Sequence, residues 1–417
     1  GKTSVAIADI VSMLHHAQVA IEFTIRANQM ANGMFHAYNL LSLSDDNLTI
    51  DNLYPMLEGQ VAALSSGYLD AVQANRVLES LFASNIYRAD QHSFMLYPER
   101  DLPSFLNKNI INSEKAQQNA LITSLVSEQN TSIVEQDADG NFRFNSALTN
   151  QGRLDQALHA LPSSWQPLVS ENKDLVHALY EQVFNHKAFT GRSGGMFGFE
   201  GLGSIYWHMV AKLLLAVQEC YFTAIAMGES AEQIAQLEQY YYQVRQGIGF
   251  NKTPQEYGAF PVDPYSHTPS HSGAQQPGMT GQVKEEVLAR FGELGIRVNQ
   301  GKVSFNPSLL RVCEFNEHKK NFKYVDIAGV WQTIALEKNS LAFTWCQVPF
   351  IYVLNNSQTL LSIEMQAEKA TRATSSTLTL NPDIARSIFN RRGDIKSITL
   401  WLTPANISSL SKETIDV

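Results

Sequence analysis

The stretch "GKVSFNPSLL" (residues 301–310) marks the point at which the sequence changes its periodicity. Before it, apolar residues recur at three- and four-residue spacing, which is typical of amphipathic helices. After it, short runs rich in β-branched and aromatic residues alternate with turn residues, which is typical of antiparallel strands. The change predicts an α+β chain, with a helical domain over residues 1–297 and an antiparallel β-sandwich over residues 298–417.

The individual elements follow from the same patterns. Helices are predicted at 3–30, 56–66, 71–84, 114–128, 152–160, 171–185, 203–227, 230–246 and 280–295. A D-G turn beside Phe142 and Phe144 predicts a small hairpin at 135–145. Strands are predicted at 330–336, 341–354, 359–366, 376–380 and 395–402.

The bulk composition excludes several classes of protein. The chain has 417 residues, of which 44% are hydrophobic and 17% charged, so it can form a large core. Its net charge of −9 argues against nucleic acid or an anionic membrane as the main partner, because both bind basic surfaces. The three cysteines lie far apart without C-x-x-C spacing, so we expect neither structural zinc nor a disulfide framework.

The predicted helix 203–227 is apolar on nearly every side and carries one polar stripe. At 100° per residue, Ser204, His208, Lys212 and Glu219 fall on one narrow face. This pattern suits the wall of a helical barrel whose stripe faces a cavity. It equally suits a core helix whose stripe reaches solvent.

A glycine-rich segment, "TGRSGGMFGFEGLGS" (190–204), precedes that helix. Glycines allow backbone N–H groups to approach a ligand, and a helix N-terminus favours anions, so Arg192 is a candidate phosphate ligand. Glu200 is a candidate acid or base, because partial burial among aromatic residues raises a carboxyl pKa. The alternative is a flexible loop that binds nothing.

A second special segment, "DPYSHTPSHSGAQQPGMTGQ" (263–282), combines prolines, glycines and neutral polar side chains. With the residues just upstream it offers donors, acceptors and aromatic faces suited to sugar hydroxyls. The candidates are Tyr257, Asp263, Tyr265, His267, His271 and Gln276. Pro269 separates the two histidines from a common helical face, so no metal site is predicted. The alternative is a rigid loop that packs on the β domain.

Two further motifs give weaker evidence of a functional site. Glu58 is expected to be a helix-terminus residue, with a functional role as the minor alternative. "DADGN" (137–141) is similar to the start of a calcium loop, but its twelfth position is Leu148 rather than a glutamate, so calcium is not expected.

Together these pieces resemble the six-hairpin, (α/α)6-toroid carbohydrate enzymes, and among them the cellobiose and chitobiose phosphorylase group with its uncharacterised relatives. "DPYSH" followed by "GMTGQ" resembles that group's Thr-Gly loop, and "GFEGLGSIYWHMVAKLLLAVQE" (198–219) resembles a stretch of the uncharacterised relatives. The resemblance implies a toroid-like helical domain, and it places Thr280 and Gly281 at a phosphate or water site. The group's Asp-Trp-Asn-Asp acid motif has no match in this chain.

The expected function is cleavage of a glycosidic bond by inversion, as a glycoside hydrolase or a phosphorylase, with Glu200 and Asp263 as the carboxylates. The expected ligand is a disaccharide or oligosaccharide. No cofactor is expected, although inorganic phosphate would be the co-substrate of a phosphorylase. Two alternatives stay open: a polysaccharide lyase that uses Tyr and His, and an inactive sugar-binding module.

The first residues, "GKTSVAIADIV", contain no secretory signal. A lone glycine before a helix is typical of a cleavage scar, so we expect a further upstream domain of the same protein. The expected location is cytoplasmic, with no membrane partner.

Overall fold

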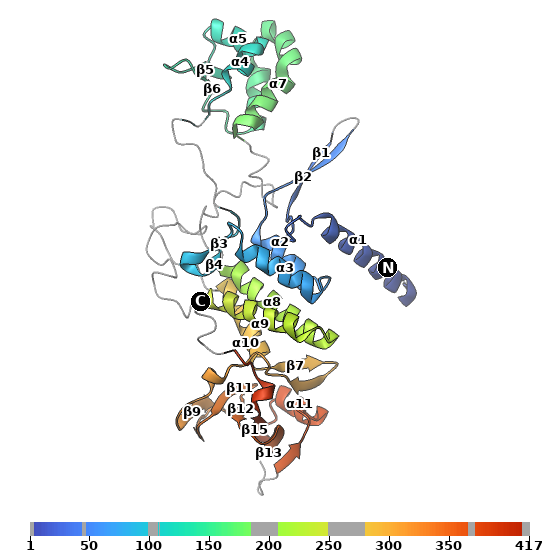
Figure 1. Cartoon of the computed structure of the whole chain (residues 1–417). Helices are drawn as coiled ribbons and strands as arrows, with labels where there is room; N and C mark the ends of the chain where they lie inside the picture. The colour runs from blue at the N-terminus through green and yellow to red at the C-terminus, as the bar shows by residue number, and fades with distance from the viewer. Residues whose placement is uncertain are drawn as a thin grey trace.

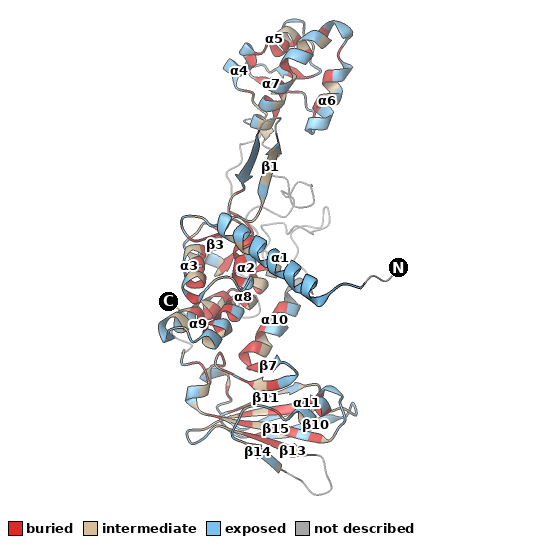
Figure 2. Cartoon of the chain, turned by 90° about the vertical axis from the view of Figure 1, so that its right-hand side faces the viewer, coloured by how far each residue is buried: buried red, intermediate tan, exposed pale blue. Residues whose placement is uncertain are grey.

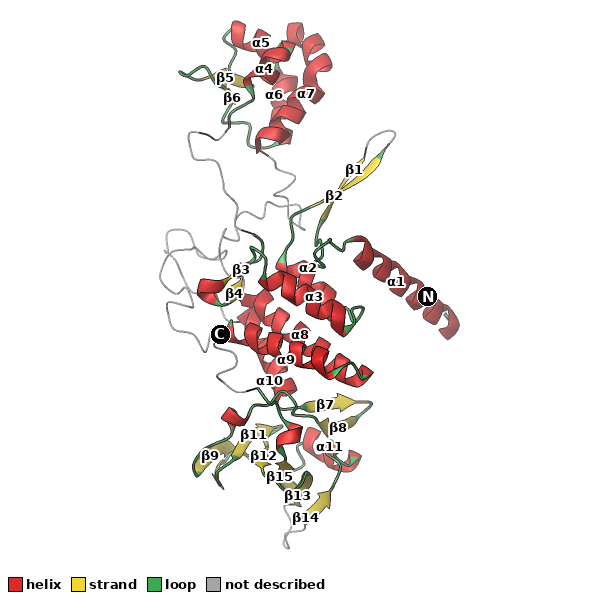
Figure 3. Ribbon diagram, in the orientation of Figure 1, coloured by secondary structure: helices red, strands yellow, loops and turns green. Residues whose placement is uncertain are grey.

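The computed structural model describes residues 4–43, 47–98, 107, 109–184, 207–248, 280–365 and 372–410. Within these residues, long helices precede Leu294 and most strands follow it (Figures 1 and 3). The α+β class predicted from the sequence is therefore confirmed.

The first group of helices packs around α8 (Trp207–Met227), the central helix of the largest hydrophobic core. The helices that contact α8 are α2 (Leu57–Ser65), α3 (Ala71–Phe82), α9 (Ala231–Gln246) and α10 (Thr280–Glu293). In the described part of the chain, α8 is also the one helix long and apolar enough to cross a membrane. More than half of it is buried inside the protein, so packing explains its apolar composition.

Helices α8 and α10 approach each other closely at Gly292. A Cβ atom at this position would lie 1.9 Å from Oε1 of Gln218 on α8. The buried Gln218 amide uses that space to donate to the Ala289 carbonyl at 2.8 Å and to the Tyr241 hydroxyl at 3.2 Å. The absence of a side chain at Gly292 therefore permits the polar contact that ties α8 to α9 and α10.

Helix α1 (Ile7–Ala27) differs from the others because none of its residues is buried (Figure 2). Only its C-terminal part reaches the core, through the half-buried Ile25. An antiparallel hairpin of β1 (Asn39–Leu43) and β2 (Leu48–Asn52) follows it and is also largely exposed. A short hairpin of β3 (Tyr87–Arg88) and β4 (Ser93–Phe94) packs beyond α3.

Residues 109–184 form a second unit with a hydrophobic core of their own. Its elements are α4 (Ser113–Gln118), α5 (Ala120–Ser127), β5 (Val134–Gln136), β6 (Phe142–Phe144), α6 (Gln151–Ala160) and α7 (Gln166–Phe184). The rings of Phe144, Tyr180 and Phe184 meet at its centre, and the Tyr180 hydroxyl donates to the Leu148 carbonyl at 2.6 Å. The antiparallel pairing of β5 with β6 confirms the predicted hairpin.

Two local features of this unit refine the sequence analysis. The predicted helix 114–128 is interrupted at Asn119, whose extended backbone ends α4 and whose side chain caps α5 by accepting from Ile122 N. The Asp137 carboxylate accepts hydrogen bonds from protein donors, first among them Arg143 at 2.7 Å and then the backbone of Asn141, and together they lower the pKa of Asp137 to about 2.

The C-terminal part has a third core beneath a five-stranded sheet of order β11-β12-β15-β13-β14. The strands are β11 (Ser340–Trp345), β12 (Val348–Leu354), β13 (Leu360–Met365), β14 (Arg372–Ser375) and β15 (Ile395–Leu402). Two hairpins accompany the sheet, formed by β7 (Ile296–Asn299) with β8 (Lys302–Phe305) and by β9 (Lys320–Val325) with β10 (Trp331–Leu336).

This sheet departs from the prediction in three ways. The predicted strand 341–354 is two strands, because Cys346 and Gln347 adopt φ of 49° and 66° and form a tight turn. The predicted strand 376–380 lies just after the observed β14. Helix α11 (Pro382–Phe389), which was not predicted, returns the chain so that β15 enters the sheet parallel to β12 rather than antiparallel.

A buried ionic cluster joins the helices to the C-terminal part. Glu293, at the end of α10, is 1% exposed and contacts Arg245 at 2.5 Å, Arg290 at 2.6 Å and the Tyr241 hydroxyl at 2.7 Å. Arg290 also contacts Glu314, beyond β8, at 2.6 Å. The helical and β-rich parts therefore share a specific polar contact as well as a covalent link.

The connection between α10 and β7 depends on a glycine. Gly295, between α10 and β7, has φ +74°, and a Cβ there would lie 2.2 Å from the Asn306 carbonyl carbon. Gly295→Ala should therefore lower the free energy of unfolding by about 2–4 kcal/mol, the sum of backbone strain and a clash with backbone atoms.

Gly301 is the matched control, because it has the same φ of +74° and nothing within 4 Å of the added Cβ. Gly301→Ala should lower the free energy of unfolding by about 1–2 kcal/mol, from strain alone. Urea denaturation of both variants checks this difference, and equal losses would contradict the close approach at Gly295.

Candidate functional site

Most of the site residues predicted from the sequence lie outside the described residues. These are Arg192, Glu200, Tyr257, Asp263, Tyr265, His267, His271 and Gln276. Thr280 and Gly281 are the first two residues of α10, as the predicted helix start requires, and the structure describes their backbone only. The two predicted segments thus lead directly into α8 and α10, which pack against each other.

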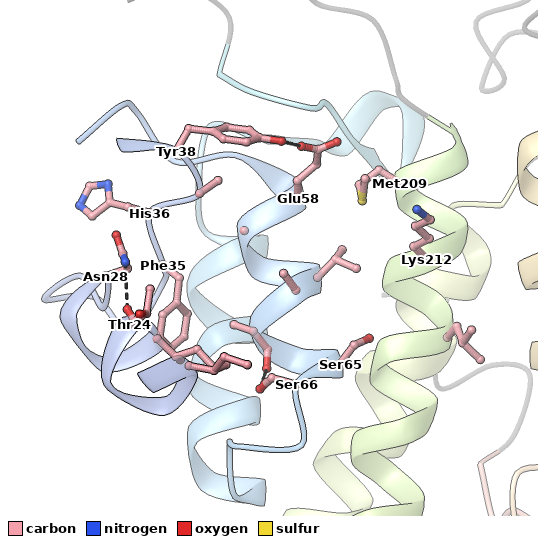
Figure 4. A pocket seen from close by; sticks show the side chains of 18 of the residues that line it. Thr24, Asn28, Phe35, His36, Tyr38, Glu58, Ser65, Ser66, Met209 and Lys212 are labelled. Carbon is pink, nitrogen blue, oxygen red and sulfur yellow. Dashed lines mark hydrogen bonds between the residues drawn. The ribbon is translucent and has the colours of Figure 1, made fainter. Parts of the chain in front are cut away.

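Both of these helices line a pocket of about 760 Å³ (Figure 4). Its other walls are the C-terminal part of α1, the segment Phe35–Tyr38 and helix α2. Most of the lining is apolar, and a few polar groups project into it, as is usual for small-molecule sites.

A buried glutamine positions one wall of this pocket. Gln60 on α2 accepts from Phe35 N and donates to Phe35 O, both at 2.8 Å, so it holds the segment like a neighbouring strand. Gly59 allows the approach, because a Cβ there would lie only 3.1 Å from the Ala37 side chain. The segment is thereby fixed beside the first turn of α2.

Glu58 projects into the pocket from that first turn (Figure 4). The Tyr38 hydroxyl donates to its Oε2 at 2.5 Å, a short charge-assisted hydrogen bond that orients the carboxylate. Glu58 is therefore at the helix terminus, as predicted, and it also faces the cavity.

Glu285 on α10 is the second carboxylate of the pocket and is only 3% exposed. Its Oε1 lies 3.1 Å from Lys284 Nζ and 3.7 Å from His208 Nε2. Its Oε2 is buried without a hydrogen-bond partner among the described residues. A buried carboxylate oxygen that accepts no hydrogen bond is costly, so it is a strong acceptor for any ligand hydroxyl that reaches it.

One part of the polar stripe of α8 faces the pocket, and another part reaches solvent. Lys212 lines the pocket, with Met209 one turn before it (Figure 4), and His208 lies beside Glu285. Glu219 is exposed to solvent, and Ser204 lies outside the described residues. The cavity interpretation holds for the first part of the stripe and the solvent interpretation for its end.

Sequence reasoning did not identify Glu285 as a site residue. The spacing of the residues contained a clue to its burial. Glu285, Ala289 and Glu293 recur every four residues along α10, so they share one face of the helix, and that face is buried. Two glutamates on the buried face of a helix are unusual, and each proves to have a specialised environment. Among the described residues, no group of three or more His, Cys, Asp or Glu could hold a metal ion.

The comparison with known protein families gives a match to one part of the chain. Residues 102–187, about a fifth of the chain, match the family described as GH149 phosphorylase insertion domain 2. This range coincides with the separately packed unit of α4–α7. The match supports a relationship to carbohydrate phosphorylases, and in particular to those of the GH149 type. No curated protein matches the chain.

Proposed function

We propose that the chain belongs to a carbohydrate-active enzyme that cleaves a glycosidic bond by phosphorolysis. The observation that carries this proposal is the match of residues 102–187 to an insertion domain of phosphorylases. The pocket between α2, α8 and α10 supports it, since its two carboxylates and one ammonium group suit a hydroxyl-rich ligand.

The proposed reaction inverts the anomeric carbon. An oxygen of inorganic phosphate attacks that carbon, the glycosidic C–O bond breaks, and a carboxylic acid donates its proton to the leaving oxygen. Glu200 and Asp263 are the proposed carboxylates, whose segments lead into the two helices that line the pocket. In the hydrolytic version, the second carboxylate would activate water instead.

The remaining predicted residues take binding roles in this proposal. Arg192, Thr280 and Gly281 would contact phosphate, where the start of α10 adds backbone N–H groups. Tyr257, Tyr265, His267, His271 and Gln276 would bind the sugar. The co-substrate is phosphate alone, and the proposed location is cytoplasmic, with neither nucleic acid nor membrane as a partner.

The proposed complete fold is a six-hairpin toroid over residues 1–297 followed by a β-sandwich over residues 298–417. The unburied α1 supports a larger helical assembly, because Ile7, Val11 and Leu14 are each more than half exposed along one side of it. An upstream domain of the same protein is the proposed cover for this side.

A screen of glucose disaccharides of every linkage, together with chitobiose, tests the function. With phosphate present, the chain should consume one of them and release a sugar 1-phosphate, and without phosphate the turnover should stop. Turnover that is independent of phosphate would make the enzyme a hydrolase. Sugar binding without turnover would identify a binding module. Formation of unsaturated products from an added uronate-containing oligosaccharide would identify a lyase.

A further inference from the structure

We propose that Glu285 is a specificity-determining residue of the pocket, which accepts a hydrogen bond from one particular sugar hydroxyl through its Oε2 atom. This inference rests on the proposed function and adds a residue that sequence reasoning did not assign. Three observations support the inference: the Glu285 side chain lines the pocket, it is buried, and its Oε2 atom accepts no hydrogen bond from the described residues.

The Oε2 atom of Glu285 makes no structural hydrogen bond within the described part of the chain. The other oxygen, Oε1, faces Lys284 and His208, so one half of the carboxylate already has cationic neighbours. The Oε2 atom is buried and accepts nothing from the described residues, although the side chain lines the pocket. A contrast on the same helix is Glu293, both of whose oxygens bind protein donors.

The charges of the pocket define what can donate to this oxygen. Its lining carries two carboxylates, Glu58 and Glu285, and the ammonium of Lys212, while the exposed ammonium of Lys284 lies 3.1 Å from Oε1 of Glu285. A uronate carboxylate beside Oε2 would bring a second negative charge next to the buried Glu285 carboxylate and would be repelled. An uncharged sugar hydroxyl can donate to Oε2 without that penalty, and the Tyr38–Glu58 pair shows that a hydroxyl donor suits a carboxylate here.

The role has a signature that a structural residue would lack. Glu285→Gln keeps the shape of the side chain but removes its negative charge. Because the wild-type charge is buried with one oxygen unsatisfied, the melting temperature should stay the same or rise. Affinity for the sugar should fall about 10- to 100-fold, the usual range for a hydrogen bond to a charged group.

The test measures binding of D-glucose, N-acetyl-D-glucosamine, the monodeoxy-D-glucoses and D-glucuronate by ligand-observed NMR. In the wild-type chain, one deoxy sugar should bind about 10- to 100-fold more weakly than its parent sugar, and D-glucuronate should not bind better than D-glucose. In Glu285→Gln, the difference between the parent and that deoxy sugar should shrink, because a neutral amide forms a weaker hydrogen bond with the hydroxyl than a carboxylate does. Glu286→Gln is the matched control, since Glu286 is half-buried on the same helix and lines a different cavity.

Each outcome decides the matter. Four results would overturn the role of Glu285. Glu285→Gln could still distinguish the parent sugar from the deoxy sugar as the wild-type chain does, or it could lose melting temperature and affinity together. The wild-type chain could bind D-glucuronate more tightly than D-glucose, or bind no sugar. The deoxy sugars test the wild-type chain directly, so the test survives a variant that does not fold. If the chain turns over a disaccharide with phosphate but fails this comparison, the proposed function stands and only the role of Glu285 is lost.

Discussion

Replacing the catalytic acid with its amide is expected to lower kcat about 10²- to 10⁴-fold, the usual contribution of a positioned general acid. This loss is expected for Glu200→Gln, for Asp263→Asn or for both. KM should change little, because an amide keeps the size and most hydrogen bonds of the carboxyl group. Initial rates of phosphate-dependent disaccharide cleavage measure the effect.

A second substrate identifies which carboxyl group acts as the acid. A nitrophenyl glycoside has a leaving group that departs without protonation, so the acid variant should retain most of its activity on this substrate. Glu219→Gln, at an exposed position of α8, serves as the control and should behave as wild type. Normal turnover of the disaccharide by both amide variants would remove Glu200 and Asp263 from the mechanism.

Glu293→Ala is expected to lower the free energy of unfolding by about 3–5 kcal/mol. The substitution would leave the Arg245 guanidinium, 18% exposed, and Arg290 without their shared carboxylate, and it would remove the acceptor of the Tyr241 hydroxyl. Because Arg290 also contacts Glu314, the loss should loosen the contact between α10 and the C-terminal part.

Glu337→Ala is the control for this prediction. Glu337 forms an ion pair with Lys319 in which both side chains are more than two-thirds exposed, so its removal should cost about 0–1 kcal/mol. Urea denaturation followed by tryptophan fluorescence compares the two variants. A similar small loss in both would show that the buried cluster does not hold the two parts together.

Most helices could be predicted from the sequence because their apolar spacing is strong and local. The predicted and observed bounds of α3, α6 and α9 agree within two residues. The break at Asn119 was missed because one asparagine ends a helix only if its backbone becomes extended, which apolar spacing does not reveal. Helix α11 was missed because it is short and lies between two strand-like runs.

The sequence did not reveal that residues 109–184 form a separate unit, and the reason is different. Its helices have the same apolar spacing as those of the first core, and periodicity does not report which helices share a core. The parallel pairing of β12 with β15 depends likewise on a long-range arrangement rather than on local preference.

The candidate site was only partly accessible from sequence. Polar loops rich in glycine and proline attract attention because their composition is unusual, and they yielded Glu200 and Asp263. A carboxylate on a buried helical face, such as Glu285, reads as an ordinary surface glutamate until its neighbours are known. Lys212 was recognised through the stripe of α8, although the sequence could not tell cavity from solvent.

The reverse reaction tests the central claim most directly. Phosphorolysis is reversible, so the chain should join a sugar 1-phosphate to an acceptor sugar and release one inorganic phosphate for each glycosidic bond formed. We expect phosphate release from one of the common hexose 1-phosphates only when an acceptor such as D-glucose or N-acetyl-D-glucosamine is present, with inversion at the anomeric carbon visible by NMR. Phosphate release without acceptor, or none with any donor and acceptor pair, would contradict the assignment as a carbohydrate phosphorylase.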